Sequence, residues 1–174
     1  MRTILILVSL MCLQSCCSVK RGLKENSDYK LITIALEKYF KREQYCILKK
    51  PDNSMTDYYY GGFTAKDVLL DYRFTYKGTG REEWKKEAFL EGDIKDKVLI
   101  IDDFSKIPKV NSDKEAKEYM SISRPMYSQD GIYAVIVINS FFNIELSPVT
   151  GYGFVFKKEK GKWKLYLEYV PYVS

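Results

Sequence analysis

The sequence predicts an α+β fold, in which an N-terminal amphipathic helix packs on a curved, mainly antiparallel sheet. Two observations predict this class. A stripe of apolar residues with helical spacing lies early in the chain, and a series of strand-like segments fills the last third. Because the helix precedes the strands instead of alternating with them, helix and sheet should segregate into two layers.

The predicted helix starts near Ser27 or Asp28, since either side chain can cap the first turn. Apolar residues then recur three and four positions apart, and charged residues occupy the opposite side. This stripe needs a sheet to cover it. Its members are Leu31, Ile32, Ala35, Leu36, Tyr39 and Phe40.

Three strands are predicted in the middle of the chain, over residues 44–49, 68–77 and 98–101. The third is a short apolar run that reads as buried. Asp102 and Asp103 follow it, and aspartates at such a position normally end a strand, because their carboxylates satisfy turn amides.

Two further helical segments are predicted, one between the second and third of these strands and one after the third. Residues 81–90 have helical spacing, with Trp84, Ala88 and Phe89 facing inward, and residues 112–120 predict one or two helical turns.

The last third carries the clearest strand signals. The continuous apolar run 132–138 is typical of a strand covered on both faces. Residues 152–158 and 162–170 predict a hairpin, in which Gly161 supplies the positive φ of a tight turn. Strict alternation in the last strand predicts that its apolar side chains share one face: Trp163, Leu165, Leu167 and Tyr169.

Residues 1–15 are predicted to be a signal peptide. Arg2 precedes an apolar run that ends at Leu13, about 16 Å long as a helix and so roughly half of a ~30 Å hydrocarbon core. The run is too short to span a membrane, but it fits the apolar region of a secretory leader. An ordinary signal peptide with incidental cysteines would share these features.

The stretch Leu13-Gln14-Ser15-Cys16 resembles the lipobox of bacterial lipoproteins. The resemblance implies cleavage before Cys16, lipidation of its sulfur, and anchoring to a membrane by two or more acyl chains. Residues 16–27 would then be a lipidated tether and residues 28–174 a single globular domain. No acidic cluster follows Cys16, so the resemblance to Bacteroidota-type lipoproteins favours the periplasmic face of the outer membrane.

A second resemblance covers part of residues 122–165. Four segments are similar to the C-terminal half of small lipoproteins and exported proteins of Bacteroidota: Ile122-Ser-Arg-Pro-Met-Tyr-Ser128, Tyr133-Ala-Val-Ile136, Gly151-Tyr-Gly153 and Lys158-Glu-Lys-Gly-Lys-Trp-Lys-Leu165. The closing hairpin is also similar to that of cystatin-like and NTF2-like cone folds. Neither resemblance supplies an activity or functional residues.

The remaining cysteines leave two possibilities open. Cys12 would leave with the leader and Cys16 would carry lipid. Cys17 and Cys46 either form a disulfide in an oxidising envelope, or stay as a free thiol beside the lipid and a buried strand residue.

Composition excludes several kinds of chemistry. The chain has no histidine, which removes Ser-His-Asp and Cys-His nucleophilic sites and the HExxH zinc site. No phosphate-binding glycine motif and no calcium loop occur, so we predict neither a cofactor nor a metal. The net charge of +5 comes from scattered lysines, which does not favour nucleic acid as a partner.

One aromatic segment stands out. Tyr58, Tyr59, Tyr60 and Phe63 surround two glycines, and if exposed they would form a contact patch for a protein or a sugar. The alternative is that they pack on the sheet and along its edge.

These observations favour a non-enzymatic, lipid-anchored envelope protein that binds a protein or an envelope polymer, including the immunity or inhibitor type. A hydrolase that uses paired carboxylates on envelope glycans is the enzymatic alternative. Its candidates are Asp71, Glu82, Glu83, Asp93, Asp96, Asp102 and Asp103. A passive structural lipoprotein is the third possibility.

Overall fold

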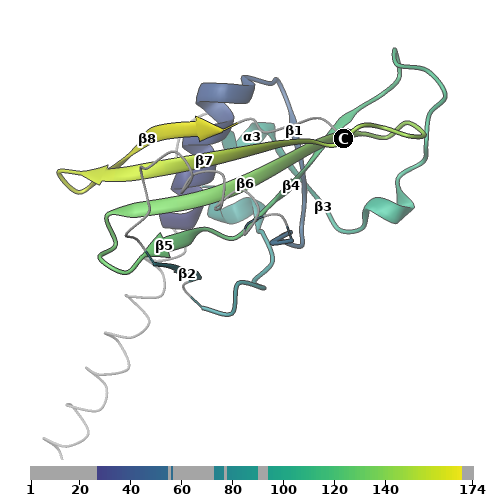
Figure 1. The fold of residues 1–174 in the computed structure, drawn as a ribbon. Helices are drawn as coiled ribbons and strands as arrows, with labels where there is room; N and C mark the ends of the chain where they lie inside the picture. The colour runs from purple at the N-terminus through teal and green to yellow at the C-terminus, as the bar shows by residue number, and fades with distance from the viewer. Residues whose placement is uncertain (1–26, 55, 57–72, 77, 90–93, 170–174) are drawn as a thin grey trace, which may run out of the picture.

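The computed structural model describes residues 27–54, 56, 73–76, 78–89 and 94–169. In these parts of the chain, a long helix packs on one face of a curved sheet of eight strands (Figure 1). The predicted α+β class is therefore confirmed. None of the helices in the described ranges has the length and apolar character needed to cross a membrane.

The long helix covers residues 27–40. Its first part, 27–35, is α-helical, and its last turn, Leu36–Phe40, is a π-helix. Lys41 ends it with φ 49°, and its N–H donates to the Leu36 carbonyl at 3.0 Å. The predicted stripe is buried except for Tyr39, which is half-buried. Ser27 and Asp28 already lie within the helix, so the prediction that one of them caps it is wrong.

The sheet is organised around β6, the longest central strand. β7 runs along one edge of β6, and β4 and β5 share the other edge, because the chain bends at residues 123–125 between them. Among the eight described strands, the pairings are antiparallel except those of β1, which lies parallel to both β3 and β4. The strands are β1 (Tyr45–Leu48), β2 (Phe74–Tyr76), β3 (Val98–Ile101), β4 (Glu118–Ile122), β5 (Met126–Ser128), β6 (Tyr133–Phe142), β7 (Thr150–Glu159) and β8 (Lys162–Tyr169).

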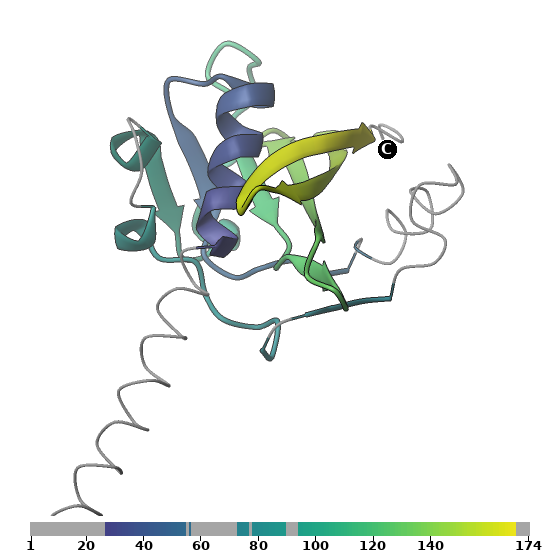
Figure 2. The same cartoon turned by 90° about the vertical axis from the view of Figure 1, so that its left-hand side faces the viewer.

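The two faces of the sheet carry separate apolar clusters. The long helix lies against one face, which we call the helix face, and the main core forms between them (Figure 2). The opposite face, which we call the outer face, carries a smaller buried cluster. Its members are Tyr133, Val135, Val137 and Val155. The apolar run is thus buried on both faces over 133–138, as predicted, whereas Ile132, the first residue of the predicted strand, lies outside β6 and is 40% exposed.

The predicted helix over 81–90 is wrong. The described residues of this segment have no regular secondary structure apart from a short 3-10 helix at Lys86–Ala88. Their backbone groups bond to distant parts of the chain: Trp84 N–H donates to the Lys49 carbonyl at 2.7 Å, and Lys85 N–H donates to the Tyr29 hydroxyl at 2.9 Å. Trp84 and Phe89 are nevertheless fully buried, as predicted, while Ala88 is half-buried.

The helical turns predicted for 112–120 are also wrong. A turn occupies residues 113–115, and the chain enters β4 at Glu118. Asn143 determines this path, because its side-chain oxygen accepts from Lys117 N–H at 2.7 Å and its own N–H donates to the Lys117 carbonyl at 3.2 Å. A short helix, α3 (Ile94–Lys97), precedes β3.

β3 is less buried than predicted. It pairs with β1, and Leu99 is 43% exposed, whereas Val98 is buried. The predicted turn after this strand is confirmed, since the Asp103 carboxylate accepts from Ser105 N–H at 3.0 Å.

The prediction that the apolar residues of β8 share one face is wrong for the second half of the strand. Leu165 lies opposite Phe156, but Leu167 lies opposite Val155, so Tyr166 is an extra residue that forms a β-bulge. Trp163 and Leu165 therefore pack on the helix face, and Leu167 and Tyr169 on the outer face. The hairpin turn itself is as predicted, with φ 79° at Gly161.

Candidate functional site

The predicted lipidation site and aromatic patch lie outside the described residues. This applies to Cys16, Tyr58, Tyr59, Tyr60 and Phe63, and also to Cys17. All of these assignments stay predictions.

Cys46 is a buried, free thiol on the outer face of β1. The residue is 7% exposed, and its register neighbour on β4 is Tyr119. Burial raises the pKa of the thiol, and the smaller opposing effect of Lys117 does not reverse this. Cys46 is therefore poorly suited to act as a nucleophile. Pairing with Cys17 stays a prediction, because Cys17 is outside the described residues.

The described acidic residues near β3 take part in surface ion pairs and turns. Lys49 Nζ lies 2.9 Å from Asp102 and 3.5 Å from Glu83, and the Asp102 side chain is 80% exposed. The Ser105 hydroxyl and N–H lower the pKa of Asp103 by donating to its carboxylate. Asp71 and Asp93 lie outside the described residues. The described members of this set, Glu82, Glu83, Asp96, Asp102 and Asp103, are all exposed.

The most polar buried site is one that the sequence did not predict. It centres on Arg124, which is 5% exposed and lies where the chain bends between β4 and β5. Its guanidinium donates to the Glu82 carbonyl through Nε at 2.8 Å and again through Nη2 at shorter range, and Nη2 also donates to the Glu83 carbonyl at 3.0 Å. The Trp84 ring stacks on the guanidinium, with its centroid 3.7 Å from Cζ.

The same guanidinium reaches the first described turn of the long helix. Arg124 Nη1 lies 3.5 Å from Asp28 Oδ2, and the Tyr127 hydroxyl donates to Asp28 Oδ1 at 2.5 Å. The Ser27 hydroxyl lies beside them and accepts from Trp163 Nε1 at 3.1 Å. Burial, and then the Asp28 charge, raise the pKa of Tyr127 well above its usual range.

This cluster connects three parts of the fold that are far apart in sequence. Arg124 holds the 81–89 segment through the Glu82 and Glu83 carbonyls, and Asp28 and Tyr127 hold the helix to β5. Its polar groups are directed at one another, so we interpret the cluster as structural. The sequence feature that could have indicated this bend is Arg124-Pro125 between strand-like segments. Proline rarely occurs within a central strand, so it marks an interruption of the strand.

The hairpin between β6 and β7 presents an apolar tip. Leu146 is 96% exposed, and Phe142 and Val149 on either side of it are 38% and 40% exposed. Leu146 also adopts φ 57°, a left-handed conformation that is uncommon for residues other than glycine, asparagine and aspartate. We call Phe142, Leu146 and Val149 the hairpin tip.

Hydrogen bonds brace the hairpin tip. Phe142 N–H donates to the Ser147 hydroxyl at 2.8 Å, which closes the loop. Asn143 is 4% exposed, and its Nδ2 donates to the Pro108 carbonyl at 2.9 Å. This hydrogen bond holds the loop that contains Pro108 against the same hairpin. The exposed apolar side chains of the hairpin tip therefore project from a loop that hydrogen bonds hold in place.

Comparison with known proteins does not extend these observations: no family profile, curated protein or solved structure matches the chain. In the described parts of the chain, no three cysteine, aspartate or glutamate residues are grouped as a metal site would require.

Proposed function

We propose that this chain is a lipid-anchored cell-envelope protein, whose folded domain is a non-enzymatic binding module for a protein partner. The anchor would be Cys16, and the contact surface would be the hairpin tip. The predicted leader supports the first part, because a short apolar run followed by a cysteine fits lipidation without a transmembrane helix.

The conformation and exposure of Leu146 carry the binding proposal. A left-handed conformation costs an L-residue about 1–2 kcal/mol, which glycine or asparagine would largely avoid. Leaving a leucine in water also forgoes about 1.5–3 kcal/mol that burial would provide. Because both costs fall on Leu146, we infer that its side chain has a function. Insertion of the leucine into an apolar pocket of a partner would recover the free energy of burial.

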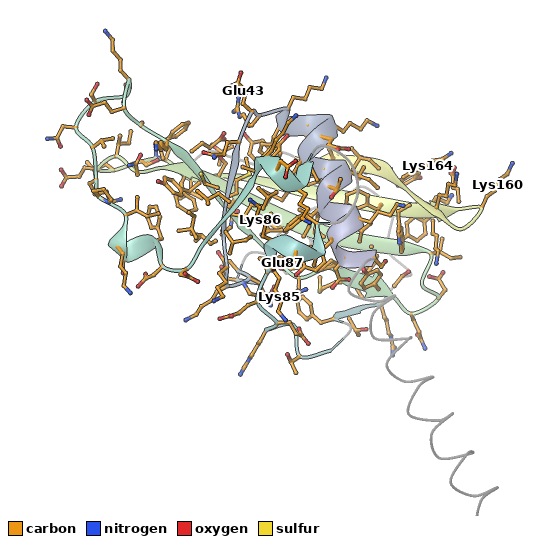
Figure 3. The ribbon with its side chains drawn as sticks, turned by 180° about the vertical axis from the view of Figure 1, so that it is seen from behind. Glu43, Lys85, Lys86, Glu87, Lys160 and Lys164 are labelled. Atoms are coloured by element: carbon orange, nitrogen blue, oxygen red, sulfur yellow. The ribbon has the colours of Figure 1, made fainter. Side chains whose placement is uncertain are left out.

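The β7–β8 turn offers a matched control for this test. Lys160 is also a left-handed, non-glycine residue at a hairpin turn, with φ 49°, but its side chain is charged and points into solvent (Figure 3). Asparagine tolerates this conformation, so Leu146→Asn and Lys160→Asn both relieve the backbone. Only Leu146→Asn also removes an exposed apolar side chain.

The experiment places a photo-crosslinking amino acid at Glu145, beside the tip, in the full-length chain in its native envelope. We expect a discrete protein adduct that Lys160→Asn retains and Leu146→Asn loses. The proposal is overturned if no adduct forms, or if Leu146→Asn leaves it unchanged.

The anchoring proposal has a separate test. Mass spectrometry of the native protein should show an acylated Cys16 as the first residue, and Cys16→Ser should release the chain from membranes in carbonate washes. An unmodified thiol at Cys16, or an intact leader, contradicts it.

A further inference from the structure

Lysines gather at the β7–β8 turn, at the end of the sheet opposite the hairpin tip (Figure 1). Residues 157–164 contain five lysines and one glutamate, and four of these lysines are exposed. Lys160 and Lys164 extend from this end of the molecule into solvent (Figure 3). We call the five lysines the basic end. Its members are Lys157, Lys158, Lys160, Lys162 and Lys164.

Much of the charge of the basic end is not neutralised within the domain. Neither Lys160 nor Lys162 forms an ion pair with any described residue. Lys164 Nζ does pair with Glu159, at 2.8 Å. The adjacent β5–β6 turn adds a second carboxylate at this end, that of Asp130. A net positive charge therefore remains at the β7–β8 turn.

The opposite end of the sheet has no such excess. Residues 106–118 and 142–149, which surround the hairpin tip, carry four lysines and four acidic residues. Residues 128–132 and 157–164, at the basic end, carry five lysines and two acidic residues. The domain is therefore polarised along β7, with its positive charge concentrated at one end.

Exposed apolar and aromatic side chains accompany the basic end. Ile132, whose carbonyl accepts from Lys158 N–H at 2.7 Å, is 40% exposed. Tyr166, the bulge residue of β8, is 49% exposed, and its ring centroid lies 5.9 Å from that of Tyr133. Lysines beside apolar and aromatic side chains are typical of surfaces that meet the headgroup region of a bilayer.

The proposed lipid anchor joins the domain at this same end. Ser27 is the first described residue of the long helix, and its hydroxyl accepts from Trp163 Nε1 at 3.1 Å. Trp163 lies opposite Lys158 in the β7–β8 hairpin, so the chain from Cys16 enters the domain beside the basic end. Cys16 precedes Ser27 by 11 positions, which limits their separation to about 40 Å. The hairpin tip lies at the other end of β7, ten residues or roughly 30 Å away.

We propose that the basic end contacts a bilayer surface that contains anionic phospholipid, and that this contact orients the hairpin tip away from the membrane. The orientation rests on the proposed anchor at Cys16, because the lipid keeps the basic end close to the bilayer and so raises its effective concentration there. Each lysine near an anionic surface then strengthens the contact roughly fivefold. The hairpin tip stands away from the membrane, where a protein partner can reach it.

The experiment uses the native, acylated protein in vesicles of phosphatidylcholine, with or without phosphatidylglycerol. An amine-reactive acetyl ester labels the lysines, and mass spectrometry measures the rate at each. We expect the exposed lysines of the basic end to react about threefold or more slowly when phosphatidylglycerol is present. Salt at about 1 M, where the Debye length is ~3 Å, should abolish this protection. Lys109 and Lys114, which are exposed near the hairpin tip, are internal controls and should react equally in both vesicles.

Two double variants with the same loss of charge test whether the lysines cause the protection. Lys160→Gln with Lys162→Gln should remove most of the protection of Lys164. Lys109→Gln with Lys114→Gln removes the same charge from the opposite end and should leave that protection unchanged. All four side chains are exposed, so both variants should melt near the temperature of the wild type.

Three results would overturn the proposal: equal labelling of the basic end in the two kinds of vesicle, protection that persists at high salt, or equal effects of the two double variants. The intact mass of the same sample reports whether Cys16 is acylated. An acylated protein without selective protection overturns this orientation alone, whereas an unmodified Cys16 overturns the anchor and the orientation with it.

Discussion

The hydroxyl of Tyr127 donates to the carboxylate of Asp28 at 2.5 Å, across 99 residues of sequence. This bond joins the long helix to β5. Arg124 forms an ion pair with the other oxygen of the same carboxylate. Buried carboxylates are rare unless paired. The position of the helix on the sheet therefore depends on a polar contact as well as on the apolar stripe.

Removing the Arg124 guanidinium should be among the most destabilising single changes in the domain. Arg124→Met removes a cation from the buried Asp28 carboxylate and a donor from the Glu82 and Glu83 carbonyls, which we expect to cost about 3–5 kcal/mol in urea unfolding. The matched control is Arg42→Met, whose side chain is 52% exposed and pairs with Glu118 at 2.8 Å. It should cost about 1 kcal/mol or less. Equal losses in the two variants would show that the buried cluster does not stabilise the fold.

Tyr127→Phe should lower stability in a pH-dependent way. Near neutral pH we expect a loss of about 1–3 kcal/mol, since Asp28 loses a short hydrogen bond. Burial and the Asp28 charge raise the pKa of Tyr127 in the folded state above its value of about 10 in the unfolded state. The contribution of Tyr127 is therefore complete below about pH 10 and decreases as the pH rises further, because the unfolded state loses the proton first.

Urea unfolding of both proteins between about pH 7 and pH 11 checks this expectation. The stability difference between wild type and Tyr127→Phe should narrow at the alkaline end. Tyr166→Phe, at a residue that is 49% exposed, is the control and should show little loss. A difference that widens with pH would contradict the assigned direction of the pKa shift.

Cys46 should react slowly with iodoacetamide in the folded protein. Burial limits access and raises the pKa of the thiol, so little thiolate is present near pH 8. Mass spectrometry of native and urea-treated samples measures the rates, and equal rates would contradict the buried position. Peptides prepared without reductant will show in addition whether Cys17 and Cys46 form a disulfide.

The β7–β8 turn should respond in opposite directions to two substitutions. Gly161→Ala places a methyl group in open space, so its expected cost of about 1–2 kcal/mol comes from the left-handed backbone alone. Lys160→Asn should raise the melting temperature, because Asn-Gly is a preferred pair in two-residue turns. Thermal unfolding measures both, and a stabilising Gly161→Ala would refute the turn geometry.

The elements that the sequence predicted correctly are those that depend on residues close together in the chain. The helix stripe from Leu31 to Phe40, the apolar run of β6 and the turn at Gly161 each follow from the spacing or conformation of neighbouring residues. The helix predicted for 81–90 is wrong because only the spacing of its apolar residues fits a helix. Its backbone N–H groups instead bond to Lys49 and Tyr29. Secondary structure there depends on partners that are remote in sequence.

The sequence by itself determined the fold class, the main helix and the C-terminal strands, whereas the lipoprotein leader stays a prediction. The tertiary structure alone decided the Arg124–Asp28 contact, the bulge at Tyr166 and the exposure of Leu146. The physical reason is that periodicity records which side of an element is apolar. Strand register, burial of polar groups and hydrogen-bond satisfaction are set by residues that meet only after the chain has folded.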